Sequence, residues 1–131
     1  MPAISYQLLI LLGRPVRLQV GALGRFCFPA GRWVYTGSAR RHMDARLARH
    51  LAGPAGKRLR WHIDYLLAHP AARIVAWRRS PVAECRLQAA TPGDTPIPGF
   101  GASDCRAGCG AHLKLLPEAL GDPPGRGWKT P

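Results

Sequence analysis

The feature that most limits what this chain can fold into is a succession of four strand-like segments in its first 37 residues. Residues 4–12 are rich in aliphatic and β-branched side chains, and Gly13-Arg14-Pro15 ends the run. Residues 16–20 and 25–28 flank a glycine-containing turn and predict a hairpin. Residues 32–37 place Trp, Val, Tyr and Thr in a row, which predicts the next strand of the sheet.

Helical patterns begin only after these strands. We expect a helix over residues 39–51, with Ser38 as its N-cap and apolar residues at every fourth position. The other expected elements are helices at 61–68 and 82–90, a strand at 73–77, a long loop at 91–110 and an edge strand at 112–116. This order predicts a mixed α/β (α+β) fold, in which helices flank a small, mostly antiparallel sheet.

The length of the chain bounds its organisation and location. Its 131 residues fit one domain, which we place at residues 1–116, followed by a frayed Pro/Gly-rich tail at 117–131. The longest apolar run is too short to cross a bilayer, and the N-terminus lacks the pattern of a secretory signal. We therefore expect a cytoplasmic protein with no membrane partner, and the sequence leaves its oligomeric state open.

The charge of the chain points to a polyanionic partner. Nineteen Lys and Arg residues against seven Asp and Glu residues give a formal net charge of +12, and sixteen of the nineteen are Arg. We expect the partner to be nucleic acid, with DNA favoured over RNA. The residues expected to contact it are Arg40, Arg41, Arg49, Lys57, Arg58 and Arg60.

One strand-to-helix passage gathers polar side chains suited to phosphate chemistry. Tyr35 lies near the end of a predicted strand, and Arg46, Arg49 and His50 stand at positions i, i+3 and i+4 of the following predicted helix. Such spacing lets several of these groups meet one phosphate.

Several short motifs, taken in order, resemble one known family. Ile4-Ser5-Tyr6 and Tyr35-Thr36-Gly37 would be its two signature tripeptides. Further matches are Trp61-His62-Ile63-Asp64-Tyr65, Ala83-Glu84-Cys85, Gly99-Phe100-Gly101, Ser103-Asp104-Cys105 and His112-Leu113. The chain resembles the GIY-YIG nuclease superfamily from about Ile4 to Leu116. It is most similar to the small stand-alone Uri-type branch, once classed as a domain of unknown function.

The resemblance implies a metal-dependent endonuclease that hydrolyses phosphodiester bonds of DNA without strong sequence preference. Glu84 would hold a divalent metal ion, magnesium or alternatively manganese, and Arg46 would neutralise the phosphate. Either Tyr6 or Tyr35 would help to deprotonate the attacking water, and we add His50 to the catalytic candidates. A nearby Arg46 and a metal ion would lower the pKa of the phenol.

Further candidates fill roles that the motifs leave open. Many nucleases of this family use a late Asn, but this chain contains none. The side chains considered for an additional polar site are His62, Asp64, Ser103, Asp104 and His112.

The cysteines give an alternative to magnesium. Cys85, Cys105, Cys109 and His112 supply enough ligands for tetrahedral zinc, although their spacing is looser than that of a zinc knuckle, and we rank zinc below magnesium. Two other functions stay open: a catalytically inactive nucleic-acid-binding module of the same fold, and a zinc-stabilised adaptor.

Overall fold

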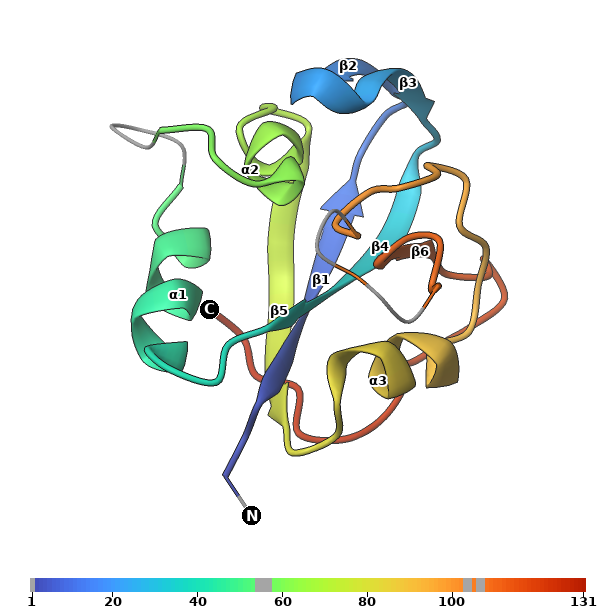
Figure 1. Ribbon diagram of the computed structural model, residues 1–131. Coiled ribbons are helices and arrows are strands. Elements are labelled where there is room, and N and C mark those ends of the chain that lie inside the picture. The colour runs from blue at the N-terminus through green and yellow to red at the C-terminus, as the bar shows by residue number, and fades with distance from the viewer. Residues whose placement is uncertain (1, 54–57, 103–104, 106–107) are drawn as a thin grey trace.

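A four-stranded antiparallel sheet is the frame of the molecule (Figure 1). The computed structural model describes residues 2–53, 58–102, 105 and 108–131. The strands lie in the order β5-β1-β4-β6, and every neighbouring pair is antiparallel. Their bounds are β1 (Ser5–Leu12), β4 (Gly31–Ser38), β5 (Ala72–Ser80) and β6 (Leu113–Leu115).

A separate hairpin and three helices surround this sheet. The hairpin pairs β2 (Val16–Val20) with β3 (Gly24–Phe28), joined by the short 3-10 helix η1 (Gly21–Leu23). The helices are α1 (Met43–Leu51), α2 (His62–Leu67) and α3 (Glu84–Ala90). The predicted α+β fold with a mostly antiparallel sheet is confirmed.

Successive side chains of β1 point to opposite faces of the sheet, so the core forms two layers. Tyr6, Leu8, Ile10 and Leu12 are buried on the face that α1, α2 and the loop before β6 cover. Leu9 lies on the opposite face, in a second cluster that includes C-terminal residues. Both faces of the central strand are therefore covered, which explains why residues 5–12 are almost entirely buried.

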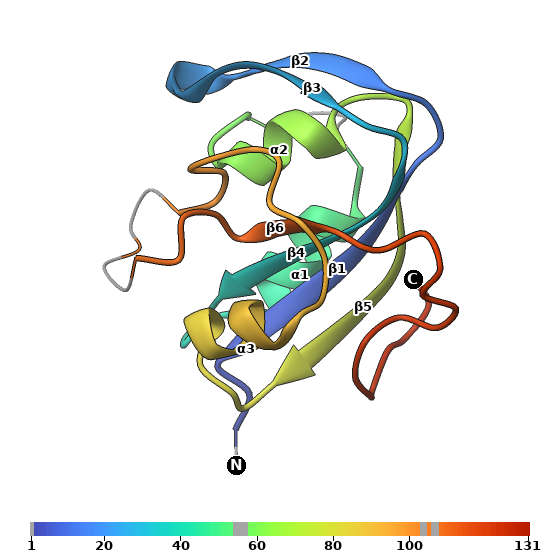
Figure 2. The same ribbon diagram turned by 90° about the vertical axis from the view of Figure 1, so that its right-hand side faces the viewer.

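The C-terminal segment packs against the sheet instead of fraying. The backbones of Trp77 and Lys129 exchange two hydrogen bonds of 2.9 and 2.8 Å, and Trp128 packs against the second apolar cluster. Figure 2 shows this segment beside β5. Two apolar side chains, those of Leu120 and Trp128, pack this segment against the second cluster. This packing explains why the segment is not frayed, contrary to what the sequence had led us to expect.

Helix α1 starts four residues later than expected, and Ser38 is not its N-cap. Ser38 is the last residue of β4, and the Ala39 N–H donates to the Ile4 carbonyl at 3.0 Å, which keeps the chain beside β1. The cap position is taken by His42 in a left-handed conformation with φ 57°. Sheet pairing therefore outweighs the local capping preference of serine at this point.

No helix in the described part of the chain is both long and apolar enough to cross a membrane.

Candidate functional site

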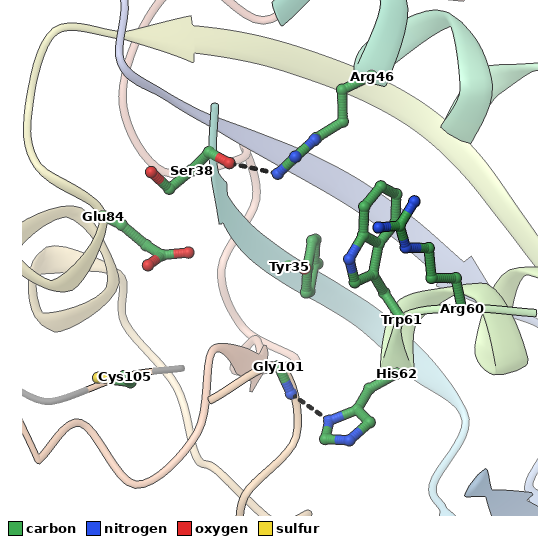
Figure 3. Close-up of a pocket in the computed structure, with 9 residues that line it drawn as sticks. All are labelled: Tyr35, Ser38, Arg46, Arg60, Trp61, His62, Glu84, Gly101 and Cys105. Carbon is green, nitrogen blue, oxygen red and sulfur yellow. Dashed lines mark hydrogen bonds between the residues drawn. The ribbon is translucent and has the colours of Figure 1, made fainter. Parts of the chain in front are cut away.

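A cavity of about 550 Å³ opens where β4, α1, the start of α2, α3 and the following loop meet. Figure 3 shows Glu84 and Cys105 on one side of it and Arg46, Arg60 and Trp61 on the other, with Tyr35 between them. The lining residues are Tyr35, Ser38, Arg46, Arg60, Trp61, His62, Glu84, Gly101 and Cys105. The fold thus brings together three of the residues expected to carry the chemistry, Tyr35, Arg46 and Glu84. Three other candidates also line the cavity: Arg60, His62 and Cys105.

Tyr6 and His50 lie directly behind this cavity. The Tyr6 hydroxyl is 2.8 Å from Nε2 of His50, and both side chains are buried. The rings of Tyr6 and Tyr35 are 6.3 Å apart between centroids. The two signature tyrosines and the predicted histidine therefore form one contiguous group.

Gly37 allows Tyr6 to take this place. Antiparallel pairing puts Tyr6 opposite Gly37, and a Cβ atom on Gly37 would lie only 2.4 Å from Cζ of the Tyr6 ring. The ring thus crosses directly over the glycine backbone. The need for glycine in the second tripeptide is steric.

The two phenols keep their protons at neutral pH. Burial raises the pKa of Tyr6 to about 12, and the positive charge of Arg46 offsets only part of that rise. Burial likewise raises the pKa of Tyr35 well above its ordinary value. The expected lowering of a phenol pKa by Arg46 is therefore outweighed by burial, and both hydroxyls can donate hydrogen bonds.

Arg46 is held at the rim of the cavity by two contacts. Its Nη1 donates to the Ser38 carbonyl at 2.6 Å, and its guanidinium lies 4.7 Å from the centroid of the Trp61 ring (Figure 3). Arg60 approaches the same indole at 5.4 Å. Arg49 also lies 4.5 Å from the centroid of this ring, and three cations against one aromatic ring make this side of the cavity suited to an anion that carries a planar group.

Arg49 and Asp64 form an ion pair between α1 and α2. Arg49 donates to both carboxylate oxygens of Asp64, at 2.6 and 2.9 Å, and the backbone N–H groups of Arg60 and Trp61 donate to the same carboxylate. Burial alone would raise the pKa of Asp64, but these donors, Arg49 first, bring it below its ordinary value. This carboxylate caps α2 and ties it to α1.

The remaining residues expected to contact nucleic acid are exposed where the structure describes them. Arg40, Arg41 and Arg58 are solvent-exposed, and Arg60 is exposed while also lining the cavity. Lys57 lies outside the described residues.

Glu84 opens α3 and faces both the cavity and His112. Its Oε2 atom is 3.2 Å from Nδ1 of His112, an ion-pair distance. On the other side of that imidazole, Nε2 is 3.8 Å from Sγ of Cys85, which in turn is 3.5 Å from Sγ of Cys105. Glu84 therefore lies at the border between the cavity and a cluster of thiols.

The thiol cluster contains Cys85, Cys105, Cys109 and His112, whose ligand atoms all lie within 4.8 Å of one another. The Glu84 carboxylate raises the pKa of His112 to about 9, although burial opposes it. The Cys109 thiol, burial and the Cys105 thiol raise the pKa of Cys85 to about 12. The Cys85 thiol therefore keeps its proton at neutral pH.

The expectation of magnesium or manganese at Glu84 is wrong. Among the described residues, the side chains gathered closely enough to share an ion are three cysteines and a histidine. Sulfur and imidazole nitrogen are the donors that zinc prefers, whereas magnesium prefers oxygen. The metal-binding potential of the described chain is therefore of the zinc type.

The other candidates for an additional polar site are divided. His62 lines the cavity, and its Nδ1 accepts the Gly101 N–H at 2.8 Å, while His112 belongs to the thiol cluster. Ser103 and Asp104 lie outside the described residues.

Sequence reasoning missed Ser38, Trp61 and Gly101 as residues of the cavity. Ser38 directly follows the second tripeptide, and its position was explained as a helix cap. Trp61 is only half-buried and lies against three arginines. Each residue belongs to a matched motif or directly follows one, and that proximity was the available signal.

Comparison with known proteins places the chain in a family. Neither curated proteins nor solved structures give a match. A family model described as "Domain of unknown function DUF123" matches residues 5–121, a range that contains the whole cavity and the thiol cluster. The match covers most of the chain, which therefore belongs to the DUF123 family.

Proposed function

We propose that this chain is an endonuclease that hydrolyses phosphodiester bonds in DNA, as its resemblance to the GIY-YIG nucleases implies. One observation carries the proposal: Tyr35, Arg46 and Glu84 line the same cavity, with Tyr6 and His50 directly behind it. These residues come from β1, β4, α1 and α3, and all five are candidates that the sequence names before the fold is known.

The cation-rich side of the cavity is suited to the phosphate. Arg46 and Arg60 flank Trp61, so a phosphate can be bound by guanidinium groups while a neighbouring base meets the exposed part of the indole. Negative charge grows on the phosphate oxygens as water attacks, and a fixed guanidinium stabilises that charge. Tyr35, protonated because its pKa is raised, adds a hydrogen-bond donor.

Glu84, on the opposite side of the cavity, is a group that can accept a proton (Figure 3). In this proposal the Glu84 carboxylate accepts a proton from the attacking water as the new phosphorus–oxygen bond forms. The bond to the leaving oxygen then breaks, and that oxygen takes a proton. That proton comes from solvent, because burial lowers the pKa of His62 and its Nδ1 accepts the Gly101 N–H; the neutral imidazole of His62, which lines the cavity, can only donate a hydrogen bond to the leaving oxygen.

A second candidate function, binding of nucleic acid without cleavage, is favoured by two specific observations. Both tyrosine pKa values are raised, so neither phenol is a ready base. Glu84 is already at ion-pair distance from His112. A protein that keeps the cationic side of the cavity but does no chemistry would also have these features.

Nicking of supercoiled plasmid or branched DNA, across several divalent salts, separates the two functions. We expect the native protein to nick DNA and Glu84→Gln to stop nicking while DNA binding is retained. The matched control is Glu118→Gln, because Glu118 is the only other glutamate and is exposed away from this cavity. Binding by the native protein with no cleavage under any condition would leave the binding module as the function.

DNA-binding measurements test the side of the cavity that carries Arg46 and Arg60. Arg46→Ala and Arg60→Ala should each weaken DNA binding and reduce the slope of log K against log salt by about 0.9. Arg73→Ala removes the same charge from an exposed position outside the cavity and should leave the slope nearly unchanged. Equal effects of all three variants would show that only net charge matters.

A further inference from the structure

The thiol cluster has no part in the proposed cleavage and lies at the edge of the cavity. Cys85 is in the first turn of α3, Cys105 and Cys109 are in the chain between α3 and β6, and His112 directly precedes β6. His112 is fixed by its backbone, since its carbonyl accepts the Thr36 N–H at 3.0 Å and its N–H donates to the Phe100 carbonyl at 2.7 Å. These backbone hydrogen bonds therefore fix the position of the His112 imidazole next to the sheet.

The distances within the cluster fit one tetrahedral ion. Zn–S bonds of about 2.3 Å and Zn–N bonds of about 2.0–2.1 Å place neighbouring ligand atoms about 3.5–3.8 Å apart. Cys85 Sγ is 3.5 Å from Cys105 Sγ and 3.8 Å from His112 Nε2, so these separations already match. The widest separation in the cluster is at most 4.8 Å and would have to shorten by about 1 Å.

The orientation of His112 supplies a second, independent indication. Its Nε2 faces the thiols, while its Nδ1 is 3.2 Å from Oε2 of Glu84. Histidines that bind metals through one nitrogen usually donate the other N–H to a carboxylate or a carbonyl, which fixes the ring and strengthens the ligand. Glu84 lies on the side of His112 where such a carboxylate is expected, at ion-pair distance from Nδ1, although the angle of this contact does not meet that of a hydrogen bond.

We propose that Cys85, Cys105, Cys109 and His112 bind one zinc ion and that Glu84 is the outer carboxylate that orients His112. On binding, the three thiols release their protons to solvent, and the imidazole keeps the proton on Nδ1, directed at Glu84. Glu84 and Cys105 also line the cavity, so the ion fixes one side of it. The zinc site stands whether or not the cavity cleaves DNA.

Metal analysis of the purified full chain is the first test. We expect one zinc per chain, lost in Cys109→Ser and in Cys85→Ser and retained in Cys27→Ser, because Cys27 is an exposed cysteine outside the cluster. Cys109→His keeps a ligand at the same place and should retain zinc if the serine variants fail to fold. Replacement of zinc by Co²⁺ should give the intense visible bands of a tetrahedral thiolate site.

Alkylation of native protein identifies the thiols involved. Cys27 should react rapidly, whereas Cys85, Cys105 and Cys109 should react only after chelation. A disulfide between Cys85 and Cys105, whose sulfurs are 3.5 Å apart, would instead give two unreactive thiols that reductant alone releases. That result, or protein without stoichiometric zinc after reconstitution under reducing conditions, overturns the proposal.

Competition with a chromophoric chelator tests the role of Glu84. We expect Glu84→Gln to lower zinc affinity 10- to 100-fold, the usual effect of losing an outer carboxylate, while the fold is retained. Glu118→Gln is the control and should bind zinc as the native chain does. Unchanged affinity in Glu84→Gln would show that Glu84 is not the outer carboxylate of this site, whatever its effect on DNA cleavage.

Discussion

The two sides of the cavity are held in place by different means. The packed side consists of Tyr6, Tyr35, Arg46, His50 and Trp61, which lie on or beside strands and helices and contact one another through rings and hydrogen bonds. The cysteine side consists of Glu84, Cys85, Cys105, Cys109 and His112. It depends on one short helix and an irregular segment, with half-buried thiols in place of a core.

This difference shows that a small domain can hold the two sides of one site by two kinds of interaction. Apolar burial is sufficient to fix the packed side, because Tyr6 and Tyr35 are part of the main core. On the cysteine side the three thiols are only half-buried, and in our proposal a bound ion supplies a cross-link between α3, the loop and the sheet. The first side should persist without an ion, whereas the second should not.

Removal of zinc should have the largest effect and should break the cysteine side alone. An ion present at about 1,000 times its dissociation constant stabilises the folded state by about 4 kcal/mol. After chelation we expect faster amide hydrogen exchange in α3 and around His112, with β1 and β4 still protected. Equal loss of protection in β1 and β4 would show that the ion holds the entire fold.

Gly37→Ala should break the packed side. The new Cβ would meet Cζ, Oη and Cε1 of Tyr6 at 2.4, 2.5 and 2.8 Å, so the ring must move out of its place in the core. We expect a loss of about 1–3 kcal/mol in the free energy of unfolding, measured with denaturant, and unchanged zinc content. Gly13→Ala is the control, since nothing lies within 4 Å of its added Cβ.

The packed side was largely predictable because its signals are local. Strand preference and alternation located β1 and β4, and the helical period located Arg46 and His50 on one helix. Pairing of Tyr6 with Gly37 then follows from strands of similar length in antiparallel register. What the local pattern could not give was the start of α1, because the bond from Ala39 to Ile4 is a contact across the sheet.

The cysteine side was poorly predictable because its geometry depends on contacts between distant segments. The sequence separations from Cys85 to Cys105 and from Cys109 to His112 match no compact zinc motif, so magnesium at Glu84 was preferred. Only the pairing of β6 with β4 and the docking of α3 bring these ligands within 4.8 Å. The same contacts place His112 beside Glu84, which no spacing rule foresees.

Acid should weaken the packed side through Asp64. Its pKa is lower in the folded chain than the ordinary value of 3.8, so its contribution to stability is complete above that value and is lost as pH falls through the folded pKa. Asp64→Asn should cost about 1.5–3 kcal/mol near neutral pH, because bonds from Arg49 and two backbone N–H groups lose their charged acceptor.

The sharper measurement is the pH dependence of the difference in unfolding free energy between the native chain and Asp64→Asn. The unfolding free energies of the native chain and Asp64→Asn, measured with denaturant, should begin to converge as pH falls below the ordinary value of 3.8, and should meet below the lower pKa of the folded chain, where the native carboxyl is protonated. Asp122→Asn removes an exposed carboxylate and should match the native chain throughout. A constant difference from neutral pH down to the acid limit would mean that packing, and not the charge of Asp64, ties α2 to α1.

Tyr6→Phe should have the smallest effect and tests whether the packed side depends on hydrogen bonds as well as shape. The substitution keeps the ring over Gly37 but removes the hydroxyl that lies 2.8 Å from Nε2 of His50. The loss of this hydrogen bond should cost about 1 kcal/mol of unfolding free energy. Tyr65→Phe, on the half-buried ring beside Gly21, is the control. The ¹⁵N shift of His50 Nε2 should change in Tyr6→Phe alone, because only that variant removes the hydrogen-bond partner of this nitrogen. Unchanged stability together with an unchanged shift would mean that ring packing by itself positions His50 behind the cavity.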